Sequence, residues 1–323
     1  MDQRPSFRKG RYTEQIAQLA AACNWLGIAK GRAARYGKLI REFFEDDARS
    51  EQHILAISES WEIIDLFELW EHRVLDFPDL ARKLKTVCSK GPLLREEENP
   101  AAATNRARND AFGYLVAGKL LAAGVPVVAV DGIISRDATC ESEADVTFQW
   151  GETFIDIECK RPQSDAALEP RTEEARKQLQ RPSRGGRHGV IALDCSVLIR
   201  PAGTLIEHDL GEVAERWLST RLEQSAAFRV ESYLTNDILG VLFFARVPAM
   251  IRVHRSPIVT ARGKPIDEFR TDSITTWLVL SNAQYAGPDV LRYLAGRLSA
   301  AMDEPIGSDR GEGMATNDLG ASG

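Results

Sequence analysis

The chain has 323 residues, of which 44% are hydrophobic and 27% are charged, and its formal net charge is −6. These values are ordinary for a globular protein of one large domain or two to three small ones, and a negative charge gives no overall support for nucleic-acid binding unless a local basic groove supplies it. The sequence contains no apolar run of the roughly 18 residues that a membrane span needs and no signal-peptide pattern at its start. Five scattered cysteines fit a reducing, cytoplasmic location better than a disulfide framework.

The first part of the chain, from Tyr12 to about Lys90, has a helical hydrophobic pattern throughout. Ile54, Ile57 and Trp61, for example, recur at steps of three and four residues, which is typical of an amphipathic helix. We therefore predict an α-helical N-terminal region of three or four helices over residues 1–95. No chemistry is evident in it, so we expect it to serve packing or homo-oligomerisation.

A second region, residues 96–304, mixes helical and strand patterns. Its first helix is expected to begin with Asn99 as the N-cap and to stop at Gly124, because glycine is favoured just past a helix end. The patterns that follow predict strands at 126–130, 145–150 and 153–159, a helix at 170–181 and a strand at 188–196. This order indicates an α/β fold, with a mixed β-sheet flanked by helices.

The end of the chain continues the same alternation. We expect a helix near 210–228, strands near 239–244, 249–254 and 276–281, and a last helix from about 288 to 302. The tail, residues 305–323, is rich in Gly, Ser, Asp and Asn and is predicted to be disordered.

The strands at 145–150 and 153–159 are predicted to form a β-hairpin around Gly151-Glu152. A two-residue loop with glycine first suits a type II′ turn, which fixes the register of the two strands. In that register Val146 faces Ile157 on an apolar face, and Asp145 lies opposite Glu158 on the other face. Opposed like charges destabilise a strand pair, so we expect a divalent cation between these carboxylates or a solvated strand face that tolerates them.

The residues Ala144-Asp145 and Glu158-Cys159-Lys160, set in this order of helix, strand, hairpin, helix and strand, resemble the core of the PD-(D/E)xK superfamily of restriction-endonuclease-like phosphodiesterases. The resemblance covers roughly Glu96 to Leu198. It implies a nuclease that depends on Mg²⁺, with Mn²⁺ as an alternative, and that hydrolyses phosphodiester bonds, with DNA as the expected substrate. Asp145 and Glu158 would bind the metal together with the carbonyl of Cys159, and Lys160 would orient or help deprotonate the attacking water.

Two flanking positions belong to the same comparison. Many members carry an acidic residue on the first core helix, but here Gly113 stands where a glutamate is expected. Asp110 lies one helical turn earlier on a similar face and is the predicted substitute as a metal ligand. Gln178 resembles the glutamine that the next core helix often places near the phosphate, and it completes the predicted catalytic set. For both Asp110 and Gln178, the alternative is that the side chain is simply exposed on a helix surface.

A basic stretch follows the predicted site. Its members, which would attract a phosphate backbone or simply cover a solvated helix face, are Arg176, Lys177, Arg181, Arg184 and Arg187. Asp156 shares the polar strand face and is expected at the solvated rim of the site.

Two other interpretations of the chain stay open. One is a nuclease-like nucleic-acid-binding or complex subunit that has lost turnover, which the glycine at position 113 favours. The other is an unrelated α/β scaffold in which the Glu-x-Lys string is accidental, although the absence of a Gly-rich phosphate loop weakens nucleotide-binding versions of it.

Overall fold

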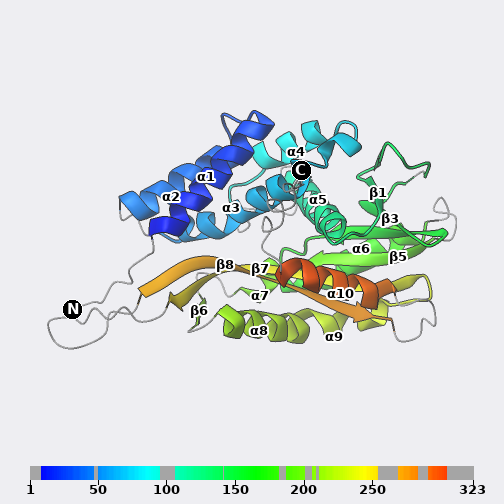
Figure 1. Ribbon diagram of the computed structural model, residues 1–323. Helices are drawn as coiled ribbons and strands as arrows, with labels where there is room; N and C mark the ends of the chain where they lie inside the picture. The colour runs from blue at the N-terminus through cyan, green and yellow to red at the C-terminus, as the bar shows by residue number, and fades with distance from the viewer. Residues whose placement is uncertain are drawn as a thin grey trace, which may run out of the picture.

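The structure, a computed structural model, describes residues 9–46, 50–94, 106–140, 142–181, 187–200, 206–208, 211–253, 268–282 and 290–303. Within these residues the chain forms a mixed β-sheet with helices on both faces (Figure 1), so the predicted α/β class is confirmed. The expected helix start at Asn99 and the tail at 305–323 lie outside them. Across the same residues, no helix combines the length and apolar character needed to cross a membrane.

Among the described residues of the N-terminal part, the chain forms four α-helices, within the three or four that the hydrophobic pattern predicts. They are α1 (Lys9–Leu26), α2 (Arg32–Glu45), α3 (Glu51–Trp70) and α4 (Leu80–Ser89). Ser50 begins α3 in a capping box, in which its side chain accepts from the backbone of His53 and the His53 ring accepts from the backbone of Ser50. Apart from such caps, helices in proteins are stabilised mainly by burial of their apolar face.

The central elements follow the predicted order. Helix α5 (Arg106–Ala122) ends before Gly124, whose φ of 75° lies in the left-handed region that glycine favours. After it come β1 (Val127–Val130), β3 (Val146–Trp150), β4 (Thr153–Lys160), α6 (Leu168–Leu179) and β5 (His188–Asp194). Strands β1, β3 and β4 pair antiparallel, and β4 and β5 pair parallel, which makes the sheet mixed.

The C-terminal strands differ from the prediction. The two strands expected at 239–244 and 249–254 are one strand, β7 (Ile238–Val253), and β8 (Glu268–Ser281) is longer than expected and pairs with it antiparallel. Pro248 does not end β7 because it lies between the residues that pair with β5 and those that pair with β6 (Ile206–His208). A proline is tolerated in a strand where its missing N–H leaves no ladder bond unmade.

Helices cover both faces of the sheet. One buried cluster combines α3, α4, α5 and α10 (Val290–Asp303) with strand residues such as Phe148, Ile155 and Phe244. A second cluster combines α6, α7 (Ser196–Ile199) and α8 (Gly211–Leu222) with the alternate strand residues, such as Ile191 and Phe243. In Figure 1 the N-terminal helices accordingly lie above the sheet, and α8 and α9 (Phe228–Val230) lie below it.

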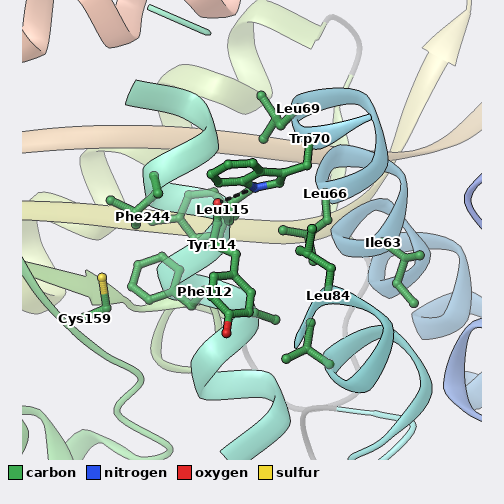
Figure 2. Packing of buried hydrophobic residues seen from close by; sticks show 14 of the residues in the cluster. Ile63, Leu66, Leu69, Trp70, Leu84, Phe112, Tyr114, Leu115, Cys159 and Phe244 are labelled. Atoms are coloured by element: carbon green, nitrogen blue, oxygen red, sulfur yellow. Dashed lines mark hydrogen bonds between the residues drawn. The ribbon is translucent and has the colours of Figure 1, made fainter. Parts of the chain in front are cut away.

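The N-terminal helices pack directly on α5. Figure 2 shows Leu69 and Trp70 of α3 against α5, and the Trp70 indole donates a hydrogen bond of 3.0 Å to the carbonyl of Tyr114. Gly118 permits this approach, because a Cβ atom there would lie 2.9 Å from the Leu69 Cβ and 2.9 Å from the indole nitrogen. Helix α5 is therefore held between the N-terminal helices and the sheet.

A buried ionic network reinforces the same contact. The fully buried guanidinium of Arg108 on α5 donates to Glu59 at 2.6 Å, to the Tyr36 hydroxyl at 2.9 Å and to the Leu93 carbonyl at 2.7 Å. Burying a charge is costly unless it is paired and hydrogen-bonded, and this network supplies such partners. It fixes the N-terminal end of α5, which carries Asp110.

Candidate functional site

A cavity of about 300 Å³ lies between α5, α6 and the end of β4, and charged and polar side chains form most of its wall. Three of the five predicted site residues line it: Asp110 from α5, Asp145 directly before β3, and Lys160 at the end of β4. Glu158 is buried beside Lys160, and Gln178 is not among the described lining residues. The structure thus gathers four of the predicted residues around one cavity.

The hairpin forms with the predicted register. Trp150 pairs with Thr153, Phe148 with Ile155 and Val146 with Ile157. Gly151 has a φ of 59°, as the first loop position of a type II′ turn requires. The apolar face of the hairpin is buried, and Trp150 at its tip lies 4.9 Å between ring centroids from Tyr293 of α10.

Asp145 lies just outside the strand that it was expected to begin. The ladder between β3 and β4 ends at the pair Val146–Ile157. On the other side of β3, the Asp145 carbonyl accepts from the backbone N–H of Asp131 at 2.8 Å. Its carboxylate accepts a hydrogen bond of 2.7 Å from the backbone N–H of Cys159 and is also hydrogen-bonded to Glu158. The two carboxyl groups therefore meet, although not as a ladder pair.

Asp145, Glu158 and Lys160 form a buried charged group. The Lys160 ammonium lies 3.5 Å from Glu158 Oε2 and 3.7 Å from Glu174 Oε1. Burial raises the pKa of Asp145, while the Cys159 N–H, the Lys160 charge and the hydrogen bond to Glu158 oppose the rise. Two buried acidic side chains this close together are costly to charge, and a bound cation would offset that cost.

Helix α5 contributes Asp110 and Gly113 to the cavity. Burial, followed by the nearby charges of Asp131 and Asp145, raises the pKa of Asp110 to about 6, and Arg106 at 3.8 Å opposes this rise. A Cβ atom at Gly113 would lie 3.8 Å from the Asp145 Cβ, so this position faces the predicted metal ligand. Asp110 and Asp145 are therefore close enough for the charge of Asp145 to affect the pKa of Asp110.

Asp131 is an acidic residue of the cavity that the sequence analysis missed. It lies in the Asp131-Gly132 loop between β1 and β2 (Ile133–Ile134), and both residues have positive φ, 49° and 71°. Its carboxylate accepts from the Tyr114 hydroxyl at 2.8 Å and from the Lys83 ammonium at 2.5 Å. The Asp-Gly pair between two apolar runs was the available signal, because it is typical of a type I′ hairpin.

Helix α6 presents Glu174 and Arg171 to the cavity, 2.6 Å apart, instead of the predicted Gln178. Glu174 lies one helical turn before Gln178, and its Oε1 atom is 3.7 Å from the Lys160 ammonium. Residues four apart on a helix share a face, so Glu174 lies on the face of α6 where Gln178 was expected. Arg161, which directly follows Lys160, also lines the cavity and binds Asp194 at 3.0 Å.

Asp156 is not at a solvated rim, as was expected. Its side chain is 2% exposed, accepts a hydrogen bond of 2.6 Å from Thr147 and lies 3.7 Å from Arg187. Loop residues around Cys140 pack over this part of the sheet with Ala129 and Phe154, which is why the face is buried. A two-residue strand period identifies faces but does not show what covers them.

Two members of the basic stretch after the site pair with an acidic residue of their own helix. Arg176 binds Glu173 at 2.7 Å, and Lys177 lies 3.3 Å from the same residue. Arg184 lies outside the described residues. The cations that line the cavity are Lys160 and three arginines, namely Arg106, Arg161 and Arg171.

The donor atoms of the site fit a hard divalent cation. Within the residues that the structure describes, no three His, Cys, Asp or Glu side chains already converge as a metal-binding group. Asp145 and Glu158 nevertheless form a buried carboxyl pair, with Asp110 in the same cavity, and carboxylate oxygens are the ligands that Mg²⁺ and Mn²⁺ prefer. The Cys159 thiol is unsuited to nucleophilic chemistry, because burial and the two acids keep its pKa well above its usual value.

Comparisons with known proteins supply no relative for this chain: no family model matches it, and neither a curated protein nor a solved structure shows a significant match.

Proposed function

We propose that this protein is a metal-dependent nuclease that hydrolyses phosphodiester bonds, with DNA as its expected substrate. The observation that carries the proposal is the meeting of Asp145, Glu158 and Lys160 at the end of one hairpin, beside a cavity that a further acidic residue, Asp110, also lines. Such a set of perturbed charges in a concave site is a marker of function.

The arrangement of the elements around this set supports the proposal. The order α5, β1, β3, β4, α6 and β5, with β3 and β4 antiparallel and β4 and β5 parallel, is the order in which the PD-(D/E)xK resemblance was found. One carboxylate directly precedes β3, the other lies in the adjacent strand β4, and the ammonium is at the end of β4, which is close to what that resemblance implies. The fold and the site residues are therefore consistent with one another.

The residues of the chain can each be assigned a task. Asp145 and Glu158 would hold the cation with Asp110 nearby, and the cation, when bound, polarises the phosphate and lowers the pKa of a bound water. Lys160 donates hydrogen bonds to the attacking water or to the phosphate oxygens and offsets the charge that develops there. The water oxygen bonds to phosphorus as one ester P–O bond breaks, the water loses a proton, and the departing sugar oxygen takes one up.

A cleavage assay tests this proposal. Purified protein is incubated with supercoiled plasmid, linear duplex and single-stranded DNA, and with RNA, in Mg²⁺, in Mn²⁺ and in EDTA. We expect cleavage of at least one DNA form with either metal and none in EDTA. Asp145→Asn, Glu158→Gln and Lys160→Met should each reduce the rate by at least about a hundredfold, in line with the loss of a charged catalytic group.

Two exposed positions provide matched controls. Glu152→Gln lies in the turn at the far end of the same hairpin, and Lys177→Met lies on the exposed face of α6. Both should retain the wild-type rate. Cleavage that persists in all three site variants would refute the mechanism, and metal-dependent binding of nucleic acid without cleavage would favour the non-catalytic binding subunit, which the glycine at position 113 makes the second candidate.

A further inference from the structure

A second, larger cavity adjoins the first. Its volume is about 630 Å³, and it lies between α4, the loop at Lys90–Pro92 and α5. It shares four wall residues with the first cavity: Arg106, Asp110, Tyr114 and Asp131. The N-terminal helices therefore extend the candidate site beyond the elements that carry its charged residues.

The wall of the second cavity combines apolar and basic groups. Val87 and Ala107 are buried side chains of this wall, with Pro92 beside them. Arg82, Lys90 and Arg106 are exposed basic residues around them, and the side chains of Arg82 and Arg106 are 73% and 83% exposed. An apolar wall with cations around it suits a ligand that has a flat organic part and an anionic part.

The electrostatics at the junction of the two cavities are also suited to a nucleotide. Lys83 reaches across from α4 to the Asp131 carboxylate and to its carbonyl at 3.0 Å, so the shared wall is held in place. Among the described lining residues, the second cavity has four basic and two acidic side chains, whereas the first has four of each, so the second has the more positive wall. A phosphate in the first cavity would thus have its neighbouring sugar and base beside the second.

Resting on the nuclease function proposed above, we propose that the second cavity binds one unpaired nucleotide of the strand whose phosphate enters the first cavity. A base within a duplex is stacked and paired and cannot enter a concave cavity without leaving the helix. The substrate class that follows is single-stranded nucleic acid, or a duplex with an unpaired end or flap. The protein selects these over a blunt duplex.

Binding measurements in EDTA test this selection without any turnover. The probes are a fluorescein-labelled single-stranded oligonucleotide and a blunt hairpin duplex of equal length, and the readout is fluorescence anisotropy. We expect the full-length protein to bind the single strand about tenfold more tightly than the duplex, because a paired base must first leave the helix to enter the cavity. Equal affinity for both probes, or no binding of the single strand, would overturn the proposal.

Thr86→Trp is the decisive variant, because Thr86 is an exposed residue of α4 that lines only the second cavity. A tryptophan there should fill the cavity and lower single-strand affinity about tenfold without changing the melting temperature. Ala81→Trp, at an exposed position of α4 that is not among the lining residues, is the matched control and should bind like the wild type. Unchanged single-strand binding by Thr86→Trp would overturn the proposal.

A double charge-reversal variant tests the same proposal independently. Arg82→Glu combined with Lys90→Glu should weaken single-strand binding and flatten its salt dependence, whereas Lys30→Glu combined with Lys38→Glu, an equal charge change at exposed positions elsewhere, should not. The two proposals fail separately. Selective single-strand binding without metal-dependent cleavage would refute the nuclease alone, and cleavage that is indifferent to strand form and to Thr86→Trp would refute the nucleotide cavity alone.

Discussion

Gly113 of α5 directly faces Asp145 of the hairpin: a Cβ atom built on the glycine would lie 3.8 Å from the aspartate Cβ. This distance is an ordinary van der Waals contact, so α5 offers room for a side chain next to the predicted metal ligand. A Cβ atom therefore fits at position 113, and this position also lines the cavity.

Replacing this glycine should strengthen metal binding. In Gly113→Glu, a further carboxylate enters a cavity that already contains Asp110 and Asp145, and more charged ligands raise the affinity for a hard cation. We expect Mn²⁺ to bind about tenfold more tightly in calorimetric titration, and the variant to melt at a lower temperature than the wild type in EDTA, because the added charge is repelled by the other acids. Gly113→Gln has the same shape without the charge, and equal metal affinity in the two variants would contradict the prediction.

Two glycines of α5 should respond in opposite directions to the same substitution. In Gly118→Ala the new Cβ would lie 2.9 Å from both Leu69 and Trp70, so we expect a loss of about 1–3 kcal/mol in the free energy of unfolding. Gly113→Ala meets no such contact and should gain up to about 1 kcal/mol, because alanine has the higher helix propensity. Urea denaturation measures both values. A loss of stability at both positions would show that α5 tolerates no added methyl group at all.

The buried arginine of α5 should be important for stability. Arg108→Leu leaves Glu59 and Glu62 without the guanidinium that lies 2.6 Å and 3.6 Å from them, so it should cost about 3–5 kcal/mol in the free energy of unfolding. Arg106→Leu, two residues away and highly exposed, should change stability by less than about 0.5 kcal/mol. Denaturant unfolding of the two variants side by side is the measurement, and equal effects would refute the role of the network.

Glu68 of α3 should make stability depend on pH. Burial, followed by the charge of Asp65, raises its pKa from 4.5 to about 7. Because the folded state then holds the proton more tightly than the unfolded chain, Glu68 should lower stability progressively as pH rises from about 4.5 to 7. In Glu68→Gln this part of the loss should disappear, so the variant should be more stable than the wild type at pH 8 and similar to it at pH 4. Thermal melts across this range check the prediction, and parallel curves for the two proteins would contradict it.

The elements that the sequence predicted well are those with strong local signals. The Gly151-Glu152 turn fixed the hairpin register, and Gly124 ended α5 where expected. The Asp131-Gly132 hairpin carried an equally strong signal that was not used. The continuous strand β7 could not be predicted from local rules, because Pro248 ends a strand in most contexts and is tolerated here only through the way β5 and β6 share the strand.

The sequence by itself determined the local geometry of the candidate site, namely a hairpin with a defined register, two carboxylates near its open end and a lysine two residues beyond the second. Only the tertiary structure decided which residues join them. Asp131, Glu174 and Arg171 reach the cavity because β1, α5 and α6 pack around the end of β4, and Asp156 is buried because a loop covers it. The physical reason is that side-chain periodicity fixes the face on which a residue lies, whereas long-range packing decides what that face meets.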